Sequence, residues 1–265
     1  MKYTIISAIS SYEIKDIYNL VMSINDSGFI GNKIMFLYSG INDGTKQFLS
    51  NNGWVNIEMT LTEGTLIHNQ RFIDVANELD NIETDVVIFL DGGDVIFQKN
   101  PTEWLDKNML GDILVTSESL KFKDDDWATE IGLKFPDYWE QTKNSEICNV
   151  GVVIGKKDYI KDLFTLIYNT VFESNRLNEL VDQFIFNVLI RNKKYNTQFI
   201  KQQEGLAAHL AVNFKYLEPY YFTEKMGKIL DNGNVINDSG NLFYIVHQYK
   251  RNKTLNKLID EKYDV

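Results

Sequence analysis

The sequence predicts an α/β fold in which an open, Rossmann-like sheet is flanked by helices. Two observations lead to this prediction. Strand-like and helix-like segments alternate along the first hundred residues, and one of the strands is apolar over nearly its whole length. The chain has 265 residues, 44% of them hydrophobic, so it can bury the core of a large domain. Because no linker or change in composition marks a boundary, we expect a single domain over 1–265.

The first half of the chain supplies the alternating elements. Residues 2–9 are apolar and β-rich, which predicts a strand, and Ser10 and Glu13 fit a capping box that would begin the next helix. Between 66 and 79, apolar residues recur at i, i+3, i+4 and i+7, the spacing of a helix that packs on a sheet. The other expected elements are strands at 33–38, 55–59 and 85–90 and a helix at 43–52 that Gly53 ends.

The second half is less regular. Strands are expected at 113–116 and 147–154, and helical stripes at 160–171 and 181–189. Residues 117–142 are polar and carry aromatic side chains, which indicates a long substrate loop with short helices. Residues 200–221 match no pattern, whereas 243–246 is typical of a last short strand followed by a basic, helical tail.

Charge and cysteine content exclude several classes of protein. The chain has 27 Lys and Arg against 37 Asp and Glu, a net charge of −10, which argues against a general nucleic-acid binder. No apolar run approaches the ~20 residues that cross a bilayer, and the N-terminus is unlike a signal peptide. We therefore expect a cytoplasmic protein without a transmembrane segment. Cys148 is the one cysteine, so any metal would be held by oxygen and imidazole.

Two aspartates at the end of the apolar strand are the most informative feature. Asp91 and Asp94 are separated by Gly92 and Gly93. An open α/β sheet binds its ligand at the carboxyl ends of its strands, where two carboxylates suit a divalent cation on a diphosphate and the glycines let a bulky anion approach. A tight turn chosen for its geometry alone is the alternative. A phosphatase-type strand fits poorly, because those enzymes place the second aspartate two residues after the first, whereas Asp94 lies three residues after Asp91.

Three histidines and one arginine are further candidates. His247 follows the last predicted strand, and an imidazole added to two carboxylates favours Mn²⁺-like metals, although a lone histidine is often a core or surface residue. His68 and His209 have no comparable neighbours, and we expect both to be structural. Arg71 is either a surface partner of Asp74 or a cation near the two aspartates.

Amide and carboxylate side chains of the second half suit sugar hydroxyls. Asn149 and Gly151 begin a predicted buried strand, where the amide can hydrogen-bond a hydroxyl and the glycine leaves room for a ring. Asp182 and Gln183 open a predicted helix. Both pairs also have a structural interpretation, as turn residues at a strand start and as an acidic residue that favours the helix dipole.

In this order the segments resemble glycosyltransferases of the GT-A fold. The resemblance is to bacterial and viral nucleotide-diphospho-sugar transferases, and glycogenin, the lipooligosaccharide galactosyltransferases and the glycosyltransferase domain of lysyl hydroxylases are similar in outline. It implies a mixed, mostly parallel sheet flanked by helices, with a nucleotide-binding half (1–100) and an acceptor- and sugar-binding half (101–265). The segments that carry it are 68–72, 87–91, 94–101, 149–155, 182–187 and 245–249.

The resemblance also implies a reaction and a role for each residue. Such an enzyme uses Mn²⁺ or Mg²⁺ to move a sugar from a nucleotide-diphospho-sugar to a hydroxyl of a glycan or glycoconjugate. Asp91, Asp94 and His247 would hold the metal, and Asp182 would be the base of an inverting reaction. The Asp-Gly-Gly-Asp spacing leaves open whether Asp91 contacts the metal or the ribose. The other implied binding residues are Ser7, Ala8, Ile9 and Ser10 around the nucleotide, Arg71, Gly92 and Gly93 at the acidic motif, Asn149, Gly151 and Gln183 at the sugar, and Lys250 near the diphosphate.

Two other functions stay open at this point. A nucleotidyltransferase also binds a nucleotide on such a sheet, but the loop at 7–11 lacks the basic residues usual in that class. A nucleotide-sugar-binding protein without turnover is the second alternative. It would not need to keep two carboxylates and an imidazole together.

Overall fold

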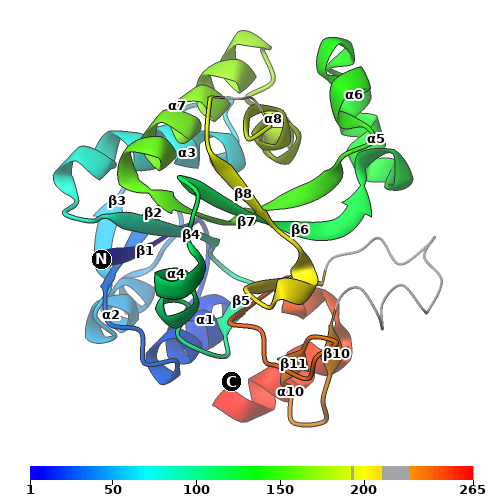
Figure 1. The fold of residues 1–265 in the computed structure, drawn as a ribbon. Coiled ribbons are helices and arrows are strands. Elements are labelled where there is room, and N and C mark those ends of the chain that lie inside the picture. The colour runs from blue at the N-terminus through cyan, green and yellow to red at the C-terminus, as the bar shows by residue number, and fades with distance from the viewer. Residues whose placement is uncertain (192–193, 211–226, 265) are drawn as a thin grey trace.

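A seven-stranded sheet with helices on both faces forms the centre of the molecule (Figure 1). The structure is a computed structural model that describes residues 1–191, 194–210 and 227–264. The strand order is β3-β2-β1-β4-β7-β6-β8, and β7 runs antiparallel to both of its neighbours while the other pairs are parallel. The predicted mixed, mostly parallel sheet is therefore confirmed. Its strands are β1 (Tyr3–Ile9), β2 (Asn32–Leu37), β3 (Val55–Glu58), β4 (Val86–Asp91), β6 (Ile113–Lys121), β7 (Glu146–Lys156) and β8 (Thr197–Ile200).

Strand β4 lies in the middle of this sheet, which explains its continuous apolar run. Val87 and Phe89 point into the core layer under α3 and α7, while Val86 and Ile88 point into the layer under α1, and all four are buried. Figure 1 shows α3, α7 and α8 over one face and α1, α2 and α4 over the other. These helices are α1 (Ile14–Asp26), α2 (Asp43–Asn51), α3 (Ile67–Glu78), α4 (Thr102–Asn108), α7 (Lys157–Glu173) and α8 (Asp182–Leu189).

A second, three-stranded sheet brings the C-terminal part of the chain beside the end of β4. It consists of β5 (Val95–Phe97), β12 (Ile245–His247) and β9 (Ala207–His209), with β12 in the middle. β12 is antiparallel to β5 and parallel to β9. The following helix α10 (Lys253–Tyr263) packs against α1, where the Asn19 amide donates a 2.7 Å hydrogen bond to Asp260.

Short elements complete the fold. The predicted polar loop contains the short helices α5 and α6, as expected, and β10 and β11 form a small hairpin. Their bounds are α5 (Asp126–Leu133), α6 (Pro136–Thr142), β10 (Lys228–Ile229) and β11 (Val235–Ile236), with 3-10 turns at Leu79–Asn81, Phe122–Asp124, Gln202–Glu204 and Tyr249–Arg251.

Three local predictions differ from the structure. The capping box at Ser10 and Glu13 is wrong: α1 begins three residues later, with Glu13 and Asp16 forming the box, because the chain turns at Ser11 in the left-handed region (φ 54°). The strand expected at 113–116 continues to 121, and Asn149 and Gly151 lie inside β7 rather than at its start. Within the stretch 200–221, which matched no pattern, residues Ala207–His209 form β9, and 211–221 lies outside the described residues.

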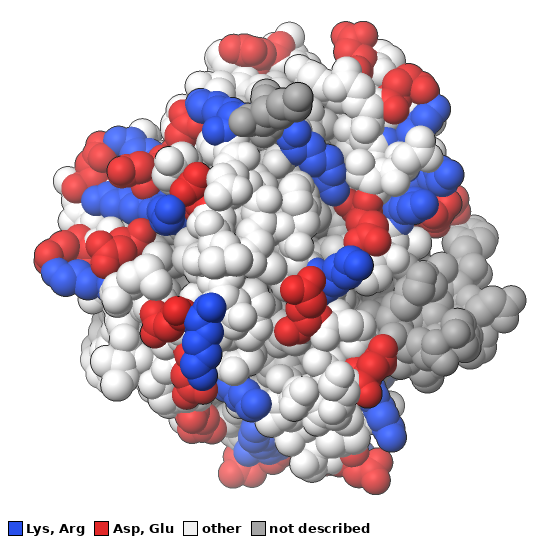
Figure 2. Space-filling view, viewed as in Figure 1, with Lys and Arg blue, Asp and Glu red and all other residues white. Residues whose placement is uncertain are grey.

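Charged side chains are interspersed with uncharged ones on the face shown in Figure 2. Blue basic groups stand beside red acidic groups rather than in one tract. Within the described part of the chain, no helix combines the length and the apolar composition needed to cross a membrane.

Candidate active site

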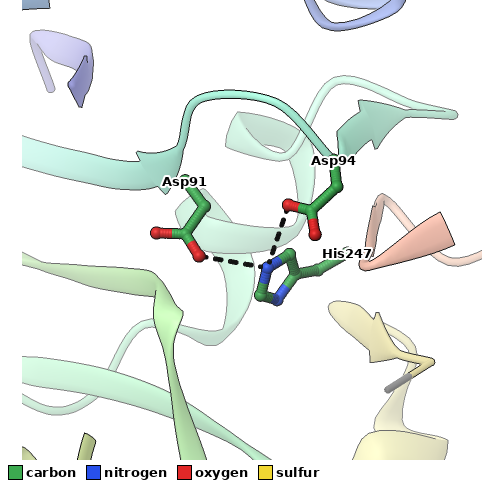
Figure 3. Close-up of side chains that lie close together, drawn as sticks. All are labelled: Asp91, Asp94 and His247. Carbon is green, nitrogen blue, oxygen red and sulfur yellow. Dashed lines mark ion pairs between the residues drawn. The ribbon is translucent and has the colours of Figure 1, made fainter. Parts of the chain in front are cut away.

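Two carboxylates and one imidazole converge at the carboxyl end of β4 (Figure 3). Asp91 is the last residue of β4, Asp94 immediately precedes β5, and His247 is the last residue of β12. The pairing of β12 with β5 places His247 opposite Val95 and so beside the aspartates. Its Nε2 lies 3.4 Å from Asp91 Oδ2 and 3.4 Å from Asp94 Oδ1. One ligand atom from each residue lies within 4.8 Å of the others.

The chemistry of this cluster fits a divalent cation. His247 is 1% exposed, and its Nε2 has no hydrogen-bond partner among the described residues. Burial disfavours the charged imidazole, but the carboxylates of Asp94 and Asp91 outweigh it and raise the pKa of His247 to about 9. Burial likewise opposes ionisation of Asp91, yet Arg71 and His247 hold the pKa of Asp91 well below its usual range. Two oxygens and one imidazole nitrogen are a donor set that suits Mn²⁺.

Gly151 on β7 makes room for the cluster. A Cβ atom at this position would lie 2.3 Å from Cε1 of His247 and 2.6 Å from Oδ2 of Asp91. No side chain fits at such distances, so close approach of β7 to the site requires glycine.

Arg71 on α3 joins two acidic residues inside the molecule. Its Nη1 donates to Asp91 Oδ1 at 2.5 Å and its Nη2 to Asp182 Oδ2 at 3.3 Å, and the residue is only 5% exposed. The interpretation of Arg71 as a cation near the aspartates is therefore correct, and the surface ion pair with Asp74 is wrong. Burial raises the pKa of Asp182, the first residue of α8, although the charge of Arg71 opposes this shift.

Two adjoining cavities share Asp91 of this cluster as a lining residue. The smaller, of about 460 Å³, is lined by Ala8, Ile9 and Ser10 at the carboxyl end of β1, by the Gly92–Gly93 turn and by Asp94 and Lys250. The larger, of about 680 Å³, is lined by Glu118, Trp127, Asn149, Asp182 and Gln183. The residues that line both cavities are His68, Arg71, Asp91, Gln248 and Arg251.

Most of the predicted residues line these cavities, but Ser7, Gly151 and His247 do not. Ser7 is fully buried, and its hydroxyl donates a 2.9 Å hydrogen bond to the Leu90 carbonyl, which ties β1 to β4. Lys250 lines the smaller cavity while its Nζ donates to the Asp16 carbonyl at 2.8 Å, and burial lowers the pKa of Lys250. Asn149 faces the larger cavity and donates to Oε1 of Glu118 at 2.6 Å.

Sequence reasoning missed several residues around the site. Glu118 is buried in β6, and burial raises the pKa of this carboxyl to about 7. Gln248 has a left-handed backbone (φ 63°), and its position directly after His247 was the one available signal. His68 lines both cavities, and His209 lies against His247, although neither had a distinguishing pattern in the sequence.

Comparison with solved structures relates this architecture to LgtC. No protein-family model and no curated protein sequence matches the chain. An active-site mutant of LgtC superposes with a TM-score of 0.58 at 11% identity, over 97% of this chain and 95% of that one. The galactosyltransferase LgtC in complex with donor and acceptor sugar analogs gives a TM-score of 0.56 at 11% identity, with the same coverage. The chain has the GT-A fold. This likeness confirms the fold expected from the sequence, and it extends over nearly the whole chain.

Proposed function

We propose that the protein is a metal-dependent glycosyltransferase that moves a sugar from a nucleotide-diphospho-sugar to a hydroxyl acceptor. The observation that carries this proposal is the cluster of Asp91, Asp94 and His247 at the end of β4, where Asp91 lines both of the adjoining cavities and Asp94 lines the smaller one. A GT-A fold with a metal-type cluster beside two adjoining cavities suits a reaction that joins two substrates at one point.

The smaller cavity suits the nucleotide diphosphate of the donor. Its walls are the loop after β1 and the tight turn at Gly92 and Gly93, where backbone can approach a bulky anion. Lys250 and Arg251 line it and supply positive charge. Asp91, Asp94 and His247 would hold Mn²⁺ or Mg²⁺. That cation supplies Lewis-acid stabilisation of the charge that develops on the departing diphosphate.

The larger cavity suits the transferred sugar and a carbohydrate acceptor. Asn149, Gln183 and Glu118 offer amide and carboxyl groups to hydroxyls, and Trp127, 40% exposed, offers an aromatic surface to a pyranose ring. In this proposal Asp182 takes the proton from the attacking hydroxyl, a role that burial favours by raising its pKa. Arg71, bonded to both Asp91 and Asp182, fixes the distance between the metal side and the acceptor side.

Thermal unfolding with nucleoside diphosphates, each with and without Mn²⁺, tests the donor site. A ligand at 100 times its Kd adds about 2.7 kcal/mol to stability, which raises the melting temperature by several degrees. We expect a Mn²⁺-dependent shift for at least one nucleoside diphosphate and its loss in Asp94→Asn. The matched control is Asp231→Asn, which changes an exposed aspartate in the β10–β11 turn and should keep the shift. No shift with any nucleotide would contradict the proposal.

Turnover separates the proposal from its alternatives. We expect the protein to release nucleoside diphosphate from a nucleotide sugar, with water or a glycoside as acceptor. The Asp182→Asn variant should lose this release. Binding without release would indicate a nucleotide-sugar-binding protein. Release of pyrophosphate from a nucleoside triphosphate in the presence of a sugar phosphate would indicate a nucleotidyltransferase.

A further inference from the structure

A buried chain of three side chains leads from β6 to the metal-type cluster. His209 stands next to His247 in the parallel pair of β9 and β12, and the two Nδ1 atoms lie 3.1 Å apart. On its other side, Nε2 of His209 lies 2.5 Å from Oγ1 of Thr116. All three residues are at most 2% exposed. The hydrogen bonds therefore run without solvent from the Thr116 hydroxyl to the imidazole that faces Asp91 and Asp94.

The contact between the two Nδ1 atoms allows only one proton between them. If neutral His209 carries its proton on Nε2, it donates to Thr116, and its bare Nδ1 accepts from Nδ1–H of His247. The other tautomer of His209 would donate from Nδ1 and would force the proton of a neutral His247 onto Nε2. That proton would point at the two carboxylates, in the place that a cation needs.

We propose that His209 is a positioning residue that holds a proton on Nδ1 of His247 and so reserves Nε2 for a divalent cation. The inference rests on the metal role proposed above for Asp91, Asp94 and His247. Histidines that bind metals commonly donate their second ring N–H to a fixed acceptor, which sets the tautomer and the ring orientation. Here the acceptor is a neutral imidazole, so it orients His247 without adding a third negative charge beside the two aspartates.

Nitrogen NMR on the metal-free protein above about pH 9, where His247 keeps a single ring proton, tests the tautomer directly. The chain has only 3 histidines, so ¹⁵N-histidine labelling gives a small set of signals, and His209→Leu identifies those of His209 by their loss. We expect long-range ¹H–¹⁵N correlations to show His209 with a protonated Nε2 and a bare Nδ1. A His209 protonated on Nδ1 alone would overturn the inference and would leave the proposed sugar transfer untouched.

Titration with Mn²⁺ alone, followed by electron paramagnetic resonance, tests the consequence for metal binding. His209→Leu removes the acceptor, and we expect Mn²⁺ affinity to fall about 10–100-fold. His209→Asn is the conservative variant, because its side-chain carbonyl can occupy the place of Nδ1, and it should keep an affinity close to that of the wild type. The melting temperature of each variant is compared to separate loss of the acceptor from loss of the fold.

The outcomes distinguish the inference from the proposed function. Equal Mn²⁺ affinity in the wild type and a folded His209→Leu variant would overturn the inference while the metal site stands. Equal losses of Mn²⁺ affinity in His209→Asn and His209→Leu would also overturn the inference, because the carbonyl of asparagine should suffice as the acceptor for Nδ1–H of His247. Absence of Mn²⁺ binding in the wild type would overturn both the inference and the metal role on which it rests.

Discussion

The free energy of unfolding of Glu118→Gln, relative to that of the wild type, should be higher at neutral pH than at acid pH. Glu118 is 6% exposed in β6, and its Oε1 accepts a 2.6 Å hydrogen bond from the Asn149 amide. Burial raises its pKa to about 7 from the ordinary 4.5. Glutamine keeps the shape of the side chain and the accepting oxygen but does not ionise. The variant therefore isolates the cost of a buried negative charge.

The magnitude follows from the difference between the folded and unfolded pKa values. A shift of about 2.5 units corresponds to about 3 kcal/mol at 1.36 kcal/mol per unit. Because the folded pKa is the higher one, the folded state binds the proton more tightly. The stabilisation is complete below about pH 4.5 and is lost as the pH rises through about 7. The free energy of unfolding of Glu118→Gln minus that of the wild type should therefore grow by up to about 3 kcal/mol across this window.

Urea unfolding at pH 5, 6, 7 and 8, with a chelator present, measures this difference. Other titrating groups are common to both proteins and cancel in the subtraction. The matched control is Glu173→Gln, which makes the same chemical change at an exposed glutamate at the end of α7 and should alter the free energy of unfolding by less than about 0.5 kcal/mol. A difference for Glu118→Gln that does not change with pH would refute the reasoning, because the carboxyl of Glu118 would then titrate alike in the folded and unfolded chain.

Three further predictions follow from burial and close packing. Gly151→Ala places a methyl group 2.3 Å from His247, so it should lower the free energy of unfolding in urea by about 1–3 kcal/mol and weaken Mn²⁺ binding. The control Gly44→Ala, at the start of α2, should change the free energy of unfolding by less than about 1 kcal/mol. Arg71→Met removes the guanidinium from Asp91 and Asp182 and should cost about 3–5 kcal/mol, because it breaks two buried ion pairs; a near-neutral result would contradict these pairs. Burial raises the pKa of Cys148 to about 11, so a thiol reagent should label it only after unfolding, and rapid labelling of the native protein would contradict this.

Local patterns were sufficient to predict the first half of the fold and the acidic end of β4. The alternation of β1, α1, β2, α2, β3, α3 and β4 depends on apolar periodicity, which each segment carries by itself. Asp91 and Asp94 were visible because they follow a strand that is buried on both faces. The start of α1 was missed because Ser10 offers a capping side chain at a point where the chain first turns through Ser11.

The rest of the site depends on contacts between distant segments, which periodicity does not encode. Nothing near His209 distinguishes it, since its partners belong to β6 and β12 and meet it only through strand pairing. Glu118 became a candidate only when β6 extended beyond its apolar stretch. Arg71 looked like half of an exposed helical ion pair until α3 was placed against the end of β4.

Because His247 is carried by β12, the metal-type cluster forms only when β12 pairs with β5 in the correct register. His247 is opposite Val95, and side chains alternate between the two faces of a strand. A slip of one residue would turn the imidazole to the other face and bring Val246 or Gln248 toward the aspartates. A cation that needs all three ligands would therefore stabilise only chains whose C-terminal segment has closed in the correct alignment. Added during refolding, such an ion would favour correctly closed molecules over misaligned ones.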